Sequence, residues 1–389
     1  MSQLHLGDFF TNRQEPGLPG LPVMSVTMND SLVLRDDLDR RTESALRPDQ
    51  HLLVRKGDIA YNMMRMWQGA CGLAEADGIV SPAYVVLQPK PNINSQFAYH
   101  WFKSARMIYL FWAYSHGLTE DRLRLYFESF AEIPAAPPAL EQQQKIADIL
   151  DKWDQAICQT ERLIAAKRKR FDRILWSTIG IGKSRQHQSK DWSQKELGDL
   201  VSFKSGGTPN RANASYWGGD IPWVSAKDLK VFEVDSSLET LTAAGAAKVN
   251  EAPAGAILLL VRGMGLFRDI PIGVAKRRIA FNQDIKALVP KALVLPKFLA
   301  YALRAKRHSI MDRVESAGHG TGRLSTSFLE ALPVAFPDIA TQGEVVKLLD
   351  SAEYSISASV NYLSQMRIQK REVMRKLLAD GWRLGRNAK

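Results

Sequence analysis

The chain has 389 residues, 45% hydrophobic and 24% charged, with a formal net charge of +11, which is the composition of a folded soluble protein of two or three domains. Its two cysteines, Cys71 and Cys158, lie far apart and outside any Cys/His cluster, which argues against a disulfide framework and a structural zinc site. The first ten residues lack the pattern of a signal peptide and the longest apolar runs are strand-sized, so we expect a cytoplasmic protein without a membrane span.

The first part of the chain, residues 1–138, is predicted to form an irregular α/β globule. Strands are expected at Leu52–Val54, Ile59–Tyr61 and Tyr84–Leu87, because Gly and Pro interrupt the chain between these apolar runs. A helix is predicted over Gln96–Phe111.

A long helix follows at about 140–179, and a second one covers about 339–379. In both segments apolar side chains recur at alternating spacings of four and three residues over four heptads, which is typical of a coiled coil. The residues expected in this seam are Ile146, Leu150, Trp153, Ile157 and Ile164 in the first helix, and Val345, Leu349, Ile356, Leu363 and Met366 in the second.

The segment between the two helices repeats the order of the first globule. Strands are predicted at Ile257–Val261 and Ile285–Val289, and a helix near Leu295–Arg307. The copies lie about 199 residues apart, and a repeat of this length indicates a duplicated domain. The repeated residues include Pro134, Pro138, Gln143, Ile146, Leu150 and Asp151, which return as Pro333, Pro337, Gln342, Val345, Leu349 and Asp350.

The predicted fold class is α/β (α+β): two globules separated by a long antiparallel two-helix coiled coil, with a pseudo-twofold internal repeat. Pairing the helices with each other is favoured because neither has a second copy within its own module; the alternative is that each helix packs on its own globule. The predicted parts are the first globule at 1–138, the first helix at 139–180, a linker at 181–191, the second globule at 192–337 and the second helix at 338–381.

No catalytic motif is found in the sequence. Gly180-Ile181-Gly182-Lys183-Ser184 imitates the end of a phosphate-binding loop, but it follows a helix and has Ser177 where the first glycine belongs. It is interpreted as a helix terminator and basic linker. The seven histidines lack the spacing of metal ligands, and Asp284 is expected to cap or orient a loop.

The features that stand out are binding features, and the basic surplus favours a polyanionic partner, although many basic proteins bind none. In Lys204-Ser205-Gly206-Gly207-Thr208-Pro209-Asn210-Arg211, backbone amides freed by the two glycines could approach a phosphate between two cations. Trp223 is expected in the core, whereas Ser225 and Lys227 are contact candidates.

In the first globule Asn62, Arg65 and Trp67 follow a strand, and an arginine beside an amide suits guanine and adenine edges. Arg65 and Arg262 could instead be ordinary surface or salt-bridged arginines. Arg122 is matched with Arg323 because each arginine follows a His-Gly pair. The run Lys167-Arg168-Lys169-Arg170 is expected to be a solvated helix face. The remaining DNA-contact candidates are Arg13, His116 and Arg268.

These motifs together resemble the DNA-specificity subunit of type I restriction–modification systems, over essentially the whole chain. The first globule departs from the pattern, because it has Asn12-Arg13-Gln14-Glu15-Pro16-Gly17 in place of the Ser-Gly-Gly-Thr-Pro loop. The resemblance is carried by Leu197-Gly198-Asp199 before that loop, Trp217-Gly218-Gly219-Asp220-Ile221-Pro222-Trp223-Val224, Asn282-Gln283 with Leu288-Val289-Pro290, and Gln142-Gln143-Gln144-Lys145-Ile146 at the start of a long helix.

The resemblance implies that each globule recognises half of an asymmetric, bipartite site in double-stranded DNA. The helices would set the gap between the half-sites and dock methyltransferase (modification) subunits, expected to be two. S-adenosylmethionine and ATP would be bound only by partners, namely the methyltransferase and a translocase–nuclease subunit. This chain would carry no catalytic residue, metal or cofactor. The alternatives are a coiled-coil adaptor without specific DNA recognition and an enzyme that acts on DNA alone.

Overall fold

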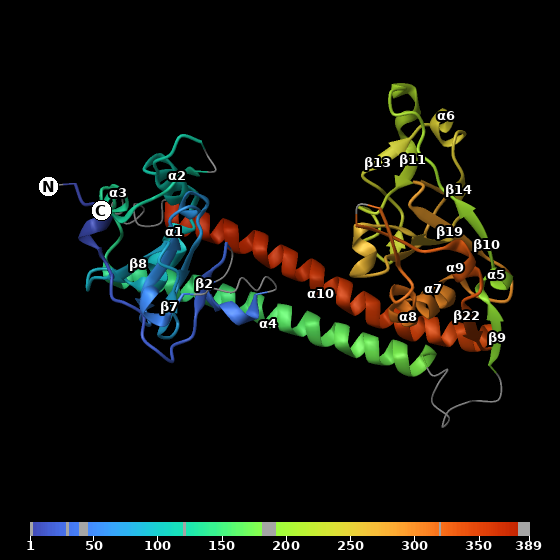
Figure 1. Cartoon of the computed structure of the whole chain (residues 1–389), viewed down its shortest axis with the longest axis horizontal. Helices are drawn as coiled ribbons and strands as arrows, with labels where there is room; N and C mark the ends of the chain where they lie inside the picture. The colour runs from blue at the N-terminus through green and yellow to red at the C-terminus, as the bar shows by residue number, and fades with distance from the viewer. Residues whose placement is uncertain are drawn as a thin grey trace, which may run out of the picture. The chain divides into compact units, whose positions relative to one another are not determined.

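The chain divides into two compact units, each made of one globule and parts of two long helices (Figure 1). The first unit contains Met1–Arg162 with Asn361–Lys389, and the second contains Leu163–Val360. The structure is a computed structural model. The structure describes residues 3–28, 31–38, 46–119, 122–180, 192–318 and 320–379, so the predicted linker 181–191 and most of the Gly180–Ser184 motif lie outside the described residues.

The globule of the first unit is built on an antiparallel four-stranded sheet in the order β1-β8-β5-β6. Two further strand pairs, β2-β3 and β4-β7, are inserted in the sequence between β1 and β8. The elements are η1 Leu6–Asp8, β1 Phe10–Asn12, β2 Met24–Val26, β3 Leu32–Leu34, η2 Arg35–Asp37, η3 Pro48–Gln50, β4 Leu52–Val54, β5 Ile59–Asn62, η4 Met66–Gln68, β6 Cys71–Leu73, β7 Gly78–Val80, β8 Tyr84–Pro89, α1 Ser95–Phe102, α2 Ala105–Ala113 and α3 Phe127–Ala131.

One predicted helix of this globule is in fact two. The prediction of a continuous helix over 96–111 is wrong because α1 ends at Phe102 and Ser104 starts α2 as an N-cap, accepting a hydrogen bond from the Met107 amide. The break lets both helices face the same aromatic core. That core contains the fully buried rings of Phe10, Tyr61, Phe97, Phe102, Phe111 and Phe130.

The globule of the second unit is larger and has a five-stranded sheet in the order β10-β19-β15-β17-β12. The globule also contains three smaller sheets, β13-β11-β18-β14, β16-β21-β20 and β22-β9. The elements are β9 Ser193–Glu196, α5 Leu197–Leu200, β10 Val201–Ser205, η6 Ala214–Tyr216, β11 Trp217–Val224, β12 Glu233–Val234, β13 Glu239–Leu241, α6 Ala243–Ala246, β14 Glu251–Ala252, β15 Ile257–Leu260, β16 Arg262–Gly263, η7 Met264–Phe267, β17 Ile272–Ala275, β18 Ile279–Phe281, β19 Ile285–Pro290, α7 Pro296–Ala305, α8 Arg307–Met311, β20 Glu315–Ala317, β21 Thr321–Arg323, α9 Thr326–Glu330 and β22 Pro333–Phe336.

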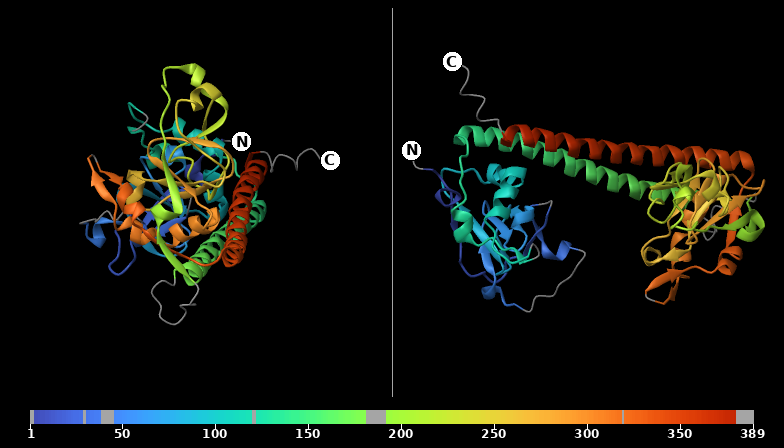
Figure 2. Two further views of the ribbon diagram at one scale, coloured as in Figure 1. Left: turned by 90° about the vertical axis from the view of Figure 1, so that its right-hand side faces the viewer. Right: turned by 90° about the horizontal axis from the view of Figure 1, so that it is seen from above.

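The long helices α4 (Leu140–Ile179) and α10 (Ile339–Ala379) run antiparallel to each other within each unit (Figures 1 and 2). In the first unit Thr160 Oγ1 lies 3.7 Å from Met366 Sδ and Lys370 forms an ion pair with Asp154 at 2.5 Å. Partner numbers rise in one helix as they fall in the other, as antiparallel packing requires. The predicted antiparallel pair is therefore confirmed within each unit.

The second unit has its own contact between the helices. Lys167 Nζ donates to Ser359 Oγ at 2.8 Å and to the Ser355 carbonyl at 3.2 Å. Lys167 is half-buried, so its assignment to a solvated helix face is wrong, while Arg168, Lys169 and Arg170 are exposed as expected. The cause is the heptad spacing, which places Lys167 in the seam.

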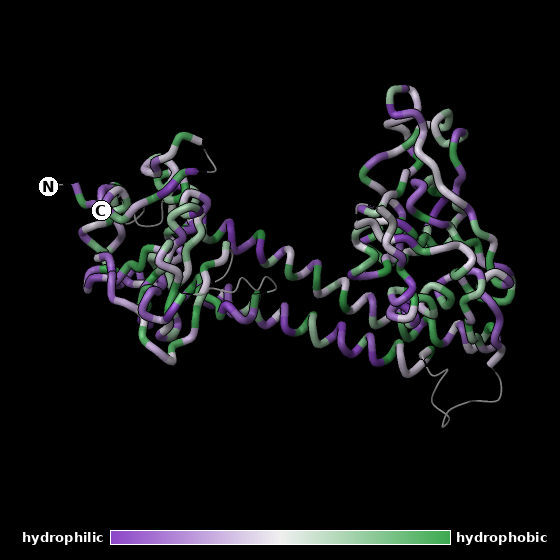
Figure 3. Tube along the Cα trace, in the orientation of Figure 1, coloured by the Kyte–Doolittle hydropathy of each residue, from purple (hydrophilic) through white to green (hydrophobic). Residues whose placement is uncertain are grey.

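Seven of the ten predicted seam residues are buried and three are half-buried, which confirms the heptad interpretation. Hydrophobic and hydrophilic stretches alternate along both helices (Figure 3). Each helix also enters both hydrophobic cores, because α4 starts in the first and ends in the second, and α10 does the reverse. The predicted alternative, packing of each helix only on its own globule, is thereby excluded. Ile146, Leu150, Ile164, Leu349, Ile356, Leu363 and Met366 are buried, and Trp153, Ile157 and Val345 are half-buried.

A buried glutamine ties the start of each long helix to its globule. Gln143 accepts a hydrogen bond from the Asn94 amide at 2.8 Å and donates to the carbonyls of Pro138 and Asn92. Gln342 accepts from the Leu295 amide at 2.8 Å and donates to Pro337 and Leu293 in the same way. The repeated glutamines therefore make the same three backbone contacts in both units. Each lies on the helix five residues after the proline whose carbonyl it bonds, so it fixes the approach to the helix.

Eight residues further along, an aspartate of each long helix anchors a buried side chain of the globule. In the first unit His100 Nε2 lies 2.7 Å from Asp151 Oδ1. In the second, the Tyr301 hydroxyl and Lys297 Nζ each donate to Asp350 at 2.7 Å. Burial and the Asp350 carboxylate together raise the pKa of Tyr301 far above its usual value.

The two buried tyrosines predict opposite effects of losing a hydroxyl. Among the described residues, Tyr61 is the one with a buried side-chain polar atom that lacks a hydrogen-bond partner. We expect Tyr61→Phe to leave the free energy of unfolding unchanged or to raise it by about 1 kcal/mol, because no hydrogen bond is lost. Tyr301→Phe, the control, should lower it by about 1–3 kcal/mol because a bond to a carboxylate is lost. Urea unfolding measures both; an equal loss in the two variants would contradict the assignment.

Candidate nucleic-acid interface

A three-stranded ribbon in the second unit brings two predicted DNA-contact residues together. Arg262 on β16 is directly opposite Arg323 on β21, and Arg323 is directly opposite Glu315 on β20. Residues opposite one another project from the same face of a sheet. All three are exposed, and neither arginine forms an ion pair with a described residue.

The other face of this ribbon is packed against the globule. A Cβ on Gly322 would lie 2.8 Å from Val314 and 3.1 Å from Leu266, and the next residue but one, Leu324, is buried. Because side chains alternate along a strand, packing of Gly322 and Leu324 turns Arg323 outward. The alternation therefore leaves the row of Arg262, Arg323 and Glu315 facing solvent.

The first unit contains a reduced version of this ribbon. His116 and Arg124 form a reciprocal pair of backbone hydrogen bonds of 2.9 Å, and the next amide, Leu125, donates to the Met63 carbonyl. In the second unit Leu324 donates to the Val261 carbonyl in the same way.

This equivalence corrects the sequence match. Arg323 corresponds to Arg124, and Glu315 to His116, both at a shift of 199 residues; the match with Arg122 is wrong. Sequence reasoning missed Arg124 because it followed the His-Gly pairs, although the repeat length itself pointed to it. Arg122 is exposed, and its amide bonds the Thr119 carbonyl.

The glycine turn after β10 is a packed joint rather than an open phosphate cradle. The Gly207 amide already donates to the Phe281 carbonyl, and a Cβ on Gly206 would lie 2.2 Å from the Asn282 carbonyl oxygen. The prediction of free backbone amides is therefore wrong for Gly207, and Gly206 is needed for close packing. The polar side chains of the turn are also engaged: Lys204 bonds the Glu251 carbonyl, Ser205 accepts from Lys286, and Thr208 donates to Gln283.

Arg211 stabilises the loop that precedes β11. Its guanidinium lies 4.4 Å from the ring centre of Trp217 and 5.0 Å from that of Trp223, and it forms an ion pair with Glu239. The Glu239 carboxylate raises the pKa of Arg211. Trp223 is buried and donates to the Gly207 carbonyl, as expected for a core residue. Two tryptophan rings and the Glu239 carboxylate thus engage the Arg211 guanidinium, so it is not a free cation.

The remaining candidates of the second unit differ in how free they are. Ser225 bonds Asp228 through its hydroxyl at 2.9 Å, which makes it part of a local turn. Lys227 and Arg268 are exposed and form no ion pair with a described residue. Asp284 exchanges hydrogen bonds with Asn282 and orients that loop, as predicted.

In the first unit the candidates at the end of β5 and just after it form a compact turn. Asn62 accepts a hydrogen bond from the Met64 amide, and Trp67 Nε1 donates to the Met64 carbonyl at 3.0 Å. Arg65 is exposed at the start of η4 and forms no ion pair with a described residue. Of this group, Arg65 alone offers an unengaged cation.

Arg13 is a structural residue in this fold. It is 8% exposed, and its Nε donates to Asp58 at 2.7 Å; a second ion pair joins it to Glu15. The Asp58 carboxylate raises the pKa of Arg13. Sequence alone did not show that Asp58 lies beside Arg13, and this pairing does not favour the predicted DNA contact, which stays a prediction.

A cluster of potential metal ligands lies at the helix anchor of the first unit. One ligand atom each from His100, Asp151 and Asp154 lies within 4.8 Å of the others. Lys370 already neutralises Asp154, and the second unit has Tyr301 at the place of His100. The arrangement is therefore a hydrogen-bonded joint that does not need a metal.

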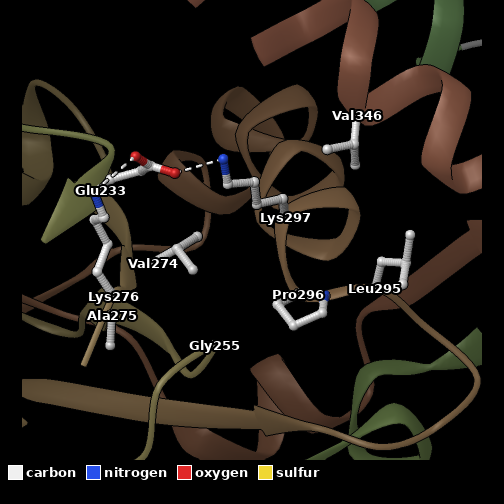
Figure 4. Close-up of a pocket in the computed structure, with 9 residues that line it drawn as sticks. All are labelled: Glu233, Gly255, Val274, Ala275, Lys276, Leu295, Pro296, Lys297 and Val346. Atoms are coloured by element: carbon white, nitrogen blue, oxygen red, sulfur yellow. Dashed lines mark ion pairs between the residues drawn. The ribbon is translucent and has the colours of Figure 1, made fainter. Parts of the chain in front are cut away.

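A hollow of about 340 Å³ lies in the second unit, where β17, the start of α7 and α10 meet (Figure 4). Lys297 crosses it to form ion pairs with Glu233 and Asp350. Because the Lys297 amine is already paired with two carboxylates, we assign the hollow to the joint between the globule and the helix.

Within the part of the chain that the structure describes, every helix is too short or too polar to span a membrane.

Two stretches of the chain, residues 28–167 and 189–361, match the family model of the type I restriction modification DNA specificity domain. The chain is 24% identical over 271 residues to the Escherichia coli type I restriction enzyme EcoR124I/EcoR124II specificity subunit, covering 66% of each. It is 30% identical over 168 residues to the MjaIX specificity subunit of Methanocaldococcus jannaschii, covering 41% of this chain and 37% of that one. The alignments thus span at most about two thirds of these two relatives.

Two solved structures have the same fold. The type I restriction–modification S subunit of M. genitalium superposes with a TM-score of 0.59 at 16% identity, covering 97% of this chain and 95% of that one. A chain from a structural study of the assembly and conformational transition of a type I system superposes with a TM-score of 0.55 at 16% identity, covering 95% and 97%. This likeness confirms the predicted fold class.

Replacing Arg13 tests its structural role. We expect Arg13→Ala to lower the free energy of unfolding by about 3–5 kcal/mol, because Asp58 is left buried and unpaired. Arg55→Ala is the control, since Arg55 forms only a half-exposed ion pair with Glu15 at 3.5 Å and should cost no more than about 1 kcal/mol. Urea unfolding distinguishes them. A fully stable Arg13→Ala variant with weakened DNA binding would instead show that Arg13 contacts DNA.

Proposed function

The chain belongs to the type I restriction–modification DNA specificity family, whose domain it carries twice, and we propose that each globule recognises one half of a bipartite DNA site. DNA recognition is the function that follows from this membership. The observation that carries the proposal is the contrast within the repeat. The glutamine and aspartate anchors recur in both units, whereas the exposed ribbon residues differ, with His116 in one unit and Glu315 in the other.

The two long helices are proposed to fix the distance between the half-sites. Helix pairs slide least where polar side chains interrupt an apolar seam, because only one register satisfies them. Lys167 with Ser359 is such a contact in the second unit, and Lys370 with Asp154 is one in the first. Each unit therefore has its own polar contact that holds the register.

The helices also supply a reason to propose two methyltransferase subunits as partners. Three exposed apolar positions of α4 recur on α10 at a shift of 199 residues, and each is between 42% and 61% exposed. Exposed apolar side chains that recur in this way suit two copies of one partner. The pairs are Leu140 with Ile339, Ile149 with Leu348, and Leu163 with Tyr362.

The chemistry is proposed to reside in the partners. The described residues offer no set of side chains arranged for methyl transfer or hydrolysis, and the perturbed groups, such as Arg211 and Tyr301, serve structural contacts. We propose that S-adenosylmethionine and ATP are bound by modification and translocase–nuclease subunits, and that this chain is non-catalytic and cytoplasmic.

Deleting the gene tests the proposed function. Cells with the chain and its modification subunit should contain adenine methylation at a bipartite sequence, and this methylation should disappear on deletion and return on complementation. Single-molecule methylome sequencing measures it. An unchanged methylome after deletion would rule out DNA specificity as the role of this chain.

A matched deletion in the helices tests the distance role. Removing 157–163 together with 363–369 takes out one facing heptad of each helix, centred on the contact between Thr160 and Met366. The helix pair shortens by roughly 10 Å, so the gap between the half-sites should shrink by up to roughly three base pairs while both half-site sequences stay the same.

The control removes 157–163 alone, which puts the remaining polar contacts out of step and should abolish methylation. Methylome sequencing reads the gap in each case. Altered half-site sequences with an unchanged gap would show that the helices do not set the distance.

A further inference from the structure

We infer that Arg124 and Arg323 are equivalent residues that hold the DNA phosphate backbone, one in each globule, and that Arg262 beside Arg323 recognises a base. This inference rests on the proposed function and assigns roles within the ribbon. It begins from the equivalence of the two arginines. Both are exposed, and each is followed by a buried leucine whose amide bonds the chain just after the central strand.

The role of the shared arginine follows from what two different half-sites have in common. The base edges of two half-sites differ, whereas their phosphates do not. A cation kept at the same place in both globules is therefore suited to the phosphates. Residues that differ between the globules are suited to the bases.

The residues around the shared arginine do differ. The residue opposite it on the ribbon is His116 in the first unit and Glu315 in the second. The strand registers also identify the counterpart of Arg262. Ile59 is opposite Leu87 in the first unit, as Ile257 is opposite Leu288 in the second, so Ile59 corresponds to Ile257. Met64, five residues after Ile59, therefore corresponds to Arg262. An acid, an imidazole, a thioether and a guanidinium contact base edges in different ways.

Charge supports the same conclusion. Arg262 and Arg323 lie directly opposite each other on neighbouring strands, where like charges repel. Glu315 neutralises one charge of this row at most. One net positive charge thus remains on an exposed row whose reverse side is packed, and a polyanion that covers the row removes the repulsion.

The test uses the complex of the full chain with its modification subunit and measures DNA binding over a range of salt concentrations. Arg124→Ala and Arg323→Ala should each weaken binding roughly tenfold or more on cognate DNA and by the same factor on DNA with an altered half-site. The slope of log K against log salt should become about one unit shallower. Arg262→Ala should instead reduce discrimination at one base pair by about 5- to 150-fold.

Lys195→Ala is the control for charge alone, because Lys195 is an exposed residue of β9, opposite Val334 in a different sheet. It should leave both affinity and salt slope unchanged. If Arg124→Ala and Arg323→Ala lose discrimination at one base pair with an unaltered salt slope, or if they bind DNA as the unsubstituted complex does, the inference is wrong. Failure of the proposed function looks different, because the unsubstituted complex would then show no preference for any bipartite sequence.

Discussion

The structure depends on a buried glutamine side chain that is hydrogen-bonded to three backbone groups. Gln143 and Gln342 each use one acceptor and two donors, and the partners come from the loop before a globule helix and from the proline just before the long helix. A buried amide that lost one of these bonds would pay the full cost of desolvation. The direction in which the chain leaves each globule is therefore fixed by a contact that tolerates little change.

The glutamine and the aspartate that recur in the two units both serve this joint. The aspartate eight residues later holds His100 in one unit and Tyr301 and Lys297 in the other, so the helix side of the contact is kept while the globule side varies. Away from the joint, the units differ in sheet size and in the residues of the ribbon. A duplicated protein that must keep its geometry and alter what it recognises is expected to diverge in this way.

The sequence predicted the long helices well because their heptads are local and regular; both begin, and α4 also ends, within one residue of the expected positions. It failed where long-range contacts decide. Arg13 and Arg211 look like free cations in sequence, but Asp58 and Glu239, 45 and 28 residues away, occupy them. The Gly206-Gly207 turn likewise looked open because nothing local shows that the chain at Phe281 lies against it. Of the DNA-contact candidates, the ribbon arginines, Arg65, Arg122 and Arg268 form no ion pair with a described residue.

The seam between the helices shows how far divergence can go without loss of register. Under the 199-residue shift, Thr160 corresponds to Ser359 and Lys167 to Met366, and these four residues form two equivalent contacts, Thr160 with Met366 and Lys167 with Ser359. In each contact a hydroxyl faces a long unbranched side chain, although one of these chains is charged and the other is not. The hydroxyl and the length of its partner are kept while the charge is not, because spacing along the helices depends on shape and register. The ribbon follows the same rule, since the backbone pairing is kept and the chemistry of the flanking side chains changes.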